Sequence, residues 1–190
     1  MPVTLLRAAI PVLWISLCVY WIVAAQNVKA TRWREPMGRR LMHGIPFLLA
    51  AALIIPPNPR WGALTGHYMP VTFASTMAGT LLVAFGLGFA VWARRHLGRD
   101  WSGTITLKED HKLVQSGPYR YIRHPIYTGL LLGFAGTAIA VDEWRSLIAT
   151  GLFTLGALIR CRVEERAMAE TFSDYIEYRR HTWALIPYIY

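Results

Sequence analysis

The chain has 190 residues, of which 54% are hydrophobic and only 16% are charged, a balance unlike that of an ordinary soluble domain. The formal net charge is +9, but the basic residues gather in the segments between long apolar runs. The composition therefore favours a polytopic membrane protein and argues against a nucleic-acid-binding one.

Three uncharged runs occupy the first half of the chain, at residues 8–28, 41–59 and 71–93. A helix needs about 20 consecutive apolar residues to cross a bilayer. We therefore expect three transmembrane helices in this half.

Two shorter uncharged runs follow, at 125–141 and 146–159, with the polar turn 142–145 between them. They predict a helical hairpin whose second arm is short for a full span, so that it either crosses and returns or is partly re-entrant. Gly129 and Gly133 form a GxxxG pair, which suits tight packing of the two antiparallel arms. The expected fold is an all-α membrane protein with about five transmembrane helices.

The distribution of charge predicts the topology. All but three of the 20 Lys and Arg residues lie on one side of the expected spans, and the exceptions are Arg7, Arg60 and Arg145. By the positive-inside rule, the N-terminus is extracytoplasmic and the C-terminus is cytoplasmic. The same basic loops favour the anionic headgroups of membrane lipids as partners.

The chain divides into two parts, residues 1–93 with three helices and residues 94–190 with the candidate chemistry. The second part begins with a polar connector over 96–122, which is too long to be a simple turn. Apolar residues near helical spacing over 162–178 predict an amphipathic cytoplasmic helix that continues from the hairpin. We expect the functional site to lie between this connector and the tail helix.

An Arg-His-Pro sequence stands at the entry to the fourth predicted span. Pro125 suits the first turn of a helix, where its missing N–H does no harm, so His124 lies near the N-cap. The free N–H groups there, together with Arg123, favour a carboxylate or a phosphate. The structural alternative is that Arg123 anchors the helix at the membrane surface and that Tyr127 is an interfacial aromatic residue.

A second candidate segment lies in the connector. Lys112, Leu113 and Val114 form a short extended piece, and a turn with Gly117 follows. Backbone amides beside apolar side chains can hold a planar heterocycle, and the face of Tyr119 can attract a cation. A plain structural hairpin explains the same residues.

Paired carboxylates follow the predicted hairpin. Glu164 lies four residues after Arg160, so the two side chains can form a salt bridge on one helix face. Alternatively, Glu164 and Glu165 bind an amino group or a sulfonium, and Arg160 holds an anionic substrate. The histidines and cysteines have no metal-ligand spacing, so we expect no metal site.

Taken together, these pieces resemble the isoprenylcysteine carboxyl methyltransferase family and the related integral-membrane phospholipid methyltransferases. The resemblance rests on HKLV at 111–114, on GPYRYIRHPIYTG at 117–129, on Glu164-Glu165, and on FSDYIEY at 172–178. It covers roughly the C-terminal half of the chain, in order and spacing.

The resemblance implies an S-adenosylmethionine-dependent methyltransferase with a lipophilic acceptor, either the carboxylate of an isoprenylcysteine-like compound or a lipid amine. It places Arg160 and Glu165 toward the acceptor as catalytic residues, with Arg162 as the alternative to Arg160. For an amine acceptor, Glu165 becomes the candidate base. The implied cofactor-binding residues are Lys112, Leu113, Val114, Gly117, Tyr119, His124, Pro125, Tyr127, Glu164 and Glu165.

Two other functions stay open at this point. Some membrane sterol or enone reductases that use NADPH also resemble this chain around an Arg-His-Pro motif. A non-enzymatic scaffold that binds anionic lipid would need only the basic connector. The Glu164-Glu165 pair and the absence of an extended C-terminal aromatic-Cys block favour methyl transfer over the reductase, and the sequence carries no signal for the oligomeric state.

Overall fold

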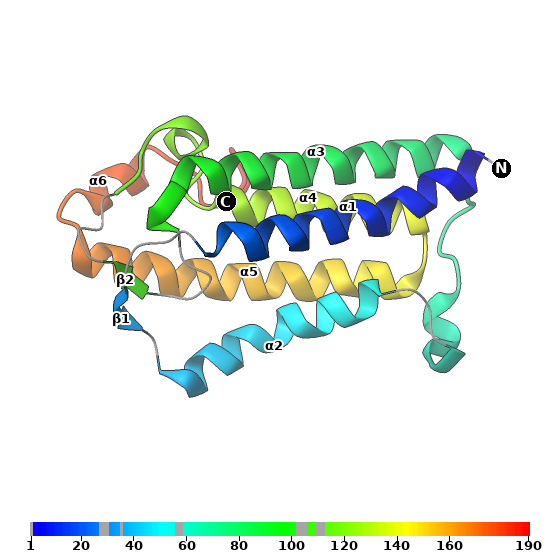
Figure 1. Ribbon diagram of the computed structural model, residues 1–190, viewed down its shortest axis with the longest axis horizontal. Coiled ribbons are helices and arrows are strands. Elements are labelled where there is room, and N and C mark those ends of the chain that lie inside the picture. Colours follow the sequence, from blue (N-terminus) through cyan, green and yellow to red (C-terminus); the bar gives the residue numbers. More distant parts are fainter. Residues whose placement is uncertain (1, 27–30, 35, 56–58, 102–105, 109–112) are drawn as a thin grey trace.

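The computed structural model describes residues 2–26, 31–34, 36–55, 59–101, 106–108 and 113–190. Long helices run side by side along one axis in these ranges, and successive helices alternate in direction (Figure 1). They are α1 (Pro2–Ala24), α2 (Met37–Ile54), α3 (Phe73–Leu97), α4 (Pro125–Val141) and α5 (Trp144–Thr171). The predicted positions of the five helices are therefore confirmed.

Short elements join the helices. A two-stranded antiparallel sheet pairs β1 (Thr31–Arg34) with β2 (Thr106–Lys108), which links the α1–α2 connection to the connector after α3. The all-α prediction did not include this sheet. It forms because the N–H and C=O groups of extended backbone need hydrogen-bond partners. The remaining short elements are η1 (Pro59–Thr65), η2 (Gly98–Asp100), η3 (Gly117–Arg120) and α6 (Tyr175–Arg180).

Glycines allow α3 and α4 to pack in backbone contact. A Cβ atom on Gly129 would lie 2.5 Å from the carbonyl oxygen of Gly86, and one on Gly136 would lie 2.7 Å from that of Gly79. A Cβ atom on Gly133 would meet the side chain of Leu87, also on α3. Assigning the GxxxG pair to the α4–α5 hairpin was therefore wrong, because the motif marks close approach without specifying which helix approaches.

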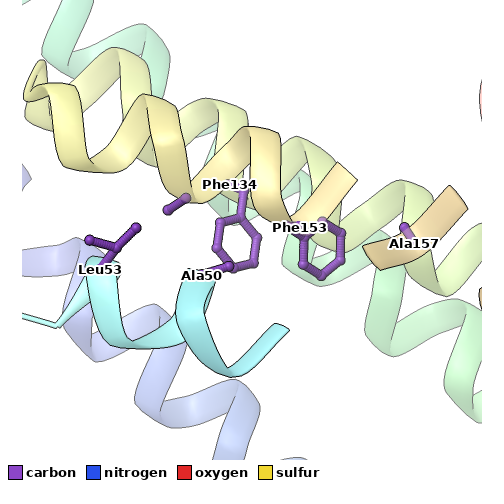
Figure 2. Close-up of a cluster of buried hydrophobic side chains, with 6 residues drawn as sticks. Ala50, Leu53, Phe134, Phe153 and Ala157 are labelled. Carbon is purple, nitrogen blue, oxygen red and sulfur yellow. The ribbon is translucent and has the colours of Figure 1, made fainter. Parts of the chain in front are cut away.

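An aromatic core joins α2, α4 and α5. Figure 2 shows Phe134 next to Ala50, with Leu53 on one side and Phe153 and then Ala157 on the other. The two phenyl rings stack with their centroids 4.5 Å apart and their planes 20° apart. Such a pair contributes about 0.5–1.5 kcal/mol beyond the burial of its area. This core fixes α5, which carries the paired glutamates, against α4.

Three helices are long and apolar enough to cross a membrane among the described residues: α1, α3 and α5. The apolar parts of α2 and α4 are shorter, at Leu41–Ile54 and Pro125–Val141. The prediction that the second arm of the hairpin is the short one was wrong, since α5 has 28 residues and α4 has 17. The apolar run ends near residue 159, but the helix continues through charged residues to Thr171.

Arginine side chains close two helices at the end of the bundle opposite α6. Arg7 donates to the carbonyl oxygen of Val141 at 2.7 Å, at the end of α4. Arg145 donates to that of Leu53 at 2.6 Å, at the end of α2. A cation at a helix C-terminus satisfies unpaired carbonyl groups and complements the helix dipole. Two of the three basic residues outside the predicted cytoplasmic side thus terminate helices.

Candidate functional site

The first turn of α4 forms one wall of the site, at the end of the bundle where α6 lies (Figure 1). His124 is the N-cap and the buried Pro125 is the first helical residue, as predicted. The backbone N–H groups of Arg123 and His124 donate to the carbonyl oxygens of Trp183 and Ala184, at 2.8 and 3.0 Å. The tail of the chain therefore accepts hydrogen bonds from the backbone N–H groups just before this helix.

Glu164 of α5 gathers three side chains. The hydroxyl group of Tyr127 donates to its Oε1 at 2.8 Å, and Nε of Arg160 donates to the same oxygen at 3.2 Å. Nδ1 of His124 lies 3.5 Å from its Oε2. The predicted salt bridge between Arg160 and Glu164 is confirmed, and the hydrogen bond from Tyr127 ties α4 to α5 at this point.

Glu165 is surrounded by cationic side chains. Nε of Arg123 donates to its Oε1 at 2.8 Å, and Nε2 of His124 lies 3.3 Å from the same oxygen. Nε of Arg179 lies 3.5 Å from Oε2. The side chain of Glu165 is only 10% exposed. Both of its oxygens are therefore engaged with neighbouring cations.

The His124 imidazole bridges the two glutamates. Burial opposes its charged form, but hydrogen bonds to the sulfur of Cys161 and to the carboxylates of Glu164 and Glu165 raise its pKa well above 6.5. The two carboxylates favour the charged form of the ring, in which both nitrogens act as donors. His124 lies between the two carboxylates and contacts both of them.

The connector joins the site through η3. Gly117 has a positive φ of 59°, a conformation that favours glycine, and the following Tyr119 is buried. The hydroxyl group of Tyr178 donates to the carbonyl oxygen of Tyr119 at 2.6 Å. Burial raises the pKa of Tyr178 to about 12, so its hydroxyl group keeps its proton. A residue of α6 thus fixes the connector.

The structure brings together most of the side chains that the sequence singled out. Leu113 and Val114 lie half-buried just before η3, on the same connector as Gly117 and Tyr119. Lys112 lies outside the described residues. The positions that cluster around the start of α4 and the end of α5 are His124, Pro125, Tyr127, Arg160, Glu164 and Glu165.

The tail departs from its predicted form. The single amphipathic helix expected over 162–178 was wrong, because α5 ends at Thr171 and α6 begins at Tyr175. This break turns the chain back, so that Nη1 of Arg123 donates to the carbonyl oxygen of Arg179 at 3.2 Å and also to that of Thr182. The predicted site contained neither Arg179 nor Thr182.

Arg123 is the one added residue of the candidate site for which the sequence did hold a signal. It lies next to His124, yet as one of many basic residues near a predicted span it also fitted a membrane anchor. Tyr178, Arg179 and Thr182 join the site only through tertiary contacts. Spacing along the sequence could not identify them.

The sequence model of the phospholipid methyltransferase family matches residues 74–175, which is more than half of the chain. The chain belongs to this family. The matched range runs from α3 through η3, α4 and α5 to the start of α6, and it contains Arg123, His124, Tyr127, Arg160, Glu164 and Glu165, while Tyr178, Arg179 and Thr182 lie beyond it.

Two protein-S-isoprenylcysteine O-methyltransferases are similar to this chain. The protein-S-isoprenylcysteine O-methyltransferase of Saccharomyces cerevisiae is 35% identical over 127 residues, covering 64% of this chain and 53% of the yeast protein. Protein-S-isoprenylcysteine O-methyltransferase B of Arabidopsis thaliana is 30% identical over 96 residues, covering 48% and 49% of the two chains.

A relative with a different name is also similar. The cobalt-zinc-cadmium resistance protein CzcN of Cupriavidus metallidurans is 34% identical over 96 residues, which cover 48% of this chain and 43% of that protein. The chain spans about half the length of the curated relatives it matches. With its long apolar helices and this family, the protein is an integral membrane protein.

Proposed function

We propose that this protein is an S-adenosylmethionine-dependent methyltransferase that acts on a lipophilic acceptor. One juxtaposition in a member of the phospholipid methyltransferase family carries the proposal: the Arg123-His124-Pro125 start of α4 meets the Glu164-Glu165 pair of α5. The names of the yeast and Arabidopsis relatives support an acceptor of the isoprenylcysteine type.

The side chains near this cluster suit the cofactor chemically. Glu164 keeps 22% of its side chain exposed, and the face of the half-buried Tyr127 beside it can attract a sulfonium or an amino group. Leu113 and Val114 offer half-buried apolar surface beside connector amides for a planar base. When bound, S-adenosylmethionine supplies the electrophilic methyl group. The cofactor-binding positions of the proposal stay those that the resemblance implies, Lys112 and Gly117 included.

The state of Glu165 favours a carboxylate acceptor over an amine. Methyl transfer is an in-line displacement that depends on alignment and on exclusion of water. An amine must also lose a proton to a base, whereas a carboxylate oxygen attacks without losing one. Glu165, the candidate base, already accepts from Arg123 and His124. In the proposed reaction Arg160 orients the acceptor carboxylate, and Glu165 positions the residues around it.

We place the site on the cytoplasmic side of the membrane, with five membrane-crossing helices and an extracytoplasmic N-terminus. The positive-inside distribution of Lys and Arg supports this topology. Cysteine labelling tests it through two exposed positions at opposite ends of the bundle. In intact cells, a membrane-impermeant maleimide should label the His67→Cys variant and not the Ser173→Cys variant, with the unsubstituted protein as the background. The reverse pattern refutes the topology.

Transfer of labelled methyl groups from S-adenosylmethionine into a total lipid extract tests the activity. The labelled product should be an alkali-labile methyl ester, since esters hydrolyse in base and methylated amines do not. Thermal unfolding in detergent with S-adenosylhomocysteine or NADPH separates the other functions. A rise in Tm with NADPH alone supports a reductase, and no rise with either compound supports a lipid-binding scaffold.

A further inference from the structure

His96, in the last turn of α3, fills a space that Gly117 leaves open. A Cβ atom on Gly117 would lie 2.6 Å from Cε1 and 2.8 Å from both nitrogens of the imidazole ring. Real side chains do not approach so closely, so the ring and the bare Cα of Gly117 fit together only because position 117 is glycine. The contact joins the end of α3 to the first residue of η3.

The same ring makes two further contacts with this turn. Nε2 of His96 and Oγ of Ser116 share a hydrogen bond of 2.9 Å. The imidazole also stacks with the ring of Tyr119, with centroids 6.4 Å apart and planes 25° apart. Ser116, Gly117 and Tyr119 are thus held by one side chain that lies 20 residues earlier in the chain.

The opposite side of the turn has its own attachment. The hydroxyl group of Tyr178 donates to the carbonyl oxygen of Tyr119, so α6 holds η3 from the tail side. His96 holds it from α3, the helix whose backbone contacts α4 through the glycine seam. Through His96, η3 is attached to the rigid helices that also carry His124.

We propose that His96 is a positioning residue that fixes the Ser116–Tyr119 turn for cofactor binding, an inference that rests on the proposed methyltransferase function. Backbone amides bind a planar ligand well only when the turn is ordered before the ligand arrives. Releasing the turn therefore weakens cofactor binding more than it slows the transfer step. His96 itself need not touch the cofactor.

Isothermal titration of the purified full chain in detergent with S-adenosylhomocysteine tests the proposal. The His96→Ala variant should bind with a Kd raised about three- to tenfold, the effect of one lost hydrogen bond. The KM for S-adenosylmethionine should rise by a similar factor while kcat changes less than twofold. The His96→Gln variant, which retains a hydrogen-bonding group for Ser116, should recover part of the affinity. The Arg95→Ala variant, altered at an exposed neighbour on the same turn, is the matched control and should bind like the parent.

The outcomes separate the inference from the function on which it rests. If the parent protein binds no S-adenosylhomocysteine, the proposed function fails. If the parent binds and His96→Ala binds equally well, the positioning role is refuted. A lower Tm for His96→Ala with unchanged Kd and KM also refutes it, because that pattern belongs to a purely structural residue.

A substitution at Gly117 gives a readout that needs no ligand. The Gly117→Ala change should lower the Tm more in the parent than in the His96→Ala background, because removing the ring also removes the clash at 2.6 Å. The backbone strain at a φ of 59° is common to both backgrounds and cancels. Equal losses of Tm would show that the ring does not pack on Gly117, and they would overturn the inference.

Discussion

Arg123 and Glu165 form an ion pair 2.8 Å long across 42 residues of sequence, with both side chains about nine-tenths buried. The same guanidinium group donates to the carbonyl oxygens of Arg179 and Thr182. One residue therefore joins the start of α4, the charged end of α5 and the tail. Glu165 is the carboxylate that holds the Arg123 side chain at this junction.

Replacing Arg123 should release the tail. The Arg123→Ala variant leaves a buried carboxylate without its nearest cation, a change that destabilises by about 3–5 kcal/mol. Amide hydrogen exchange at Trp183 and His124 should accelerate, since the Trp183 N–H donates to the carbonyl oxygen of Tyr121 and the His124 N–H donates to that of Ala184. Arg123→Lys should rescue only part of the effect, because an ammonium group lacks the planar fork. Arg120→Ala, at an exposed neighbour, is the control, and unchanged exchange in Arg123→Ala would contradict the anchoring role.

Removing the charge of Glu164 should weaken cofactor binding with little change in the shape of the side chain. The Glu164→Gln variant loses the partner of Arg160 and His124, so we expect a Kd for S-adenosylhomocysteine more than tenfold higher. Tyr127→Phe removes a single hydrogen bond to a charged group and should destabilise by about 1.5–3 kcal/mol. Titration calorimetry and thermal unfolding measure the two effects. Glu177→Gln, with a 63% exposed side chain, should match the parent in both.

The stability of the protein should fall at alkaline pH through His124. Its pKa is raised in the folded state, so the stabilisation is fully present below the unfolded value of 6.5 and is lost as the pH rises through the folded value. Thermal unfolding from pH 6 upward should therefore show a decline in Tm that His124→Gln lacks. A parallel decline in both proteins would show that another group is responsible.

The α3–α4 contact offers a matched pair of glycines. Gly86→Ala would place a Cβ atom 2.6 Å from the Gly129 carbonyl oxygen, so the helices must separate, at about 1–3 kcal/mol. Gly88, two residues away on the same helix, has nothing within 4 Å. Gly88→Ala should leave the Tm unchanged or raise it slightly, because alanine favours helix. Thermal unfolding in detergent compares the two, and equal effects would rule out the tight seam.

The sequence predicted those parts of the fold that depend on local composition. Uncharged runs located the long helices, and the preference of proline for the first turn of a helix located the start of α4 at Pro125. The end of α5 escaped prediction because the helical spacing over 162–178 continues across the break between Thr171 and Tyr175, where the chain turns back toward Arg123. The β1–β2 pairing was missed for a similar reason, since it joins two connections far apart in the chain.

The candidate site also has one part that local spacing predicts and another part that depends on tertiary contacts. The Arg160–Glu164 pair follows from helical spacing and was predictable. The contacts of Glu165 with Arg123 and Arg179 depend on how the tail folds back after α5, which no local pattern encodes. The resemblance identified the position of Glu165, and its surroundings change the role we assign to it from base to anchor. The division of the chain at residue 93 stays a prediction.

Arg7 and Arg145 have a structural role besides their contribution to the distribution of charge. Each guanidinium group binds backbone carbonyl oxygens at the end of a helix, and that of Arg145 also pairs with the carboxylate of Glu143. Neither residue therefore acts as a free cation facing lipid headgroups. Changing either arginine to a neutral residue would therefore leave carbonyl groups at a helix end without a donor, rather than only remove one charge from the surface.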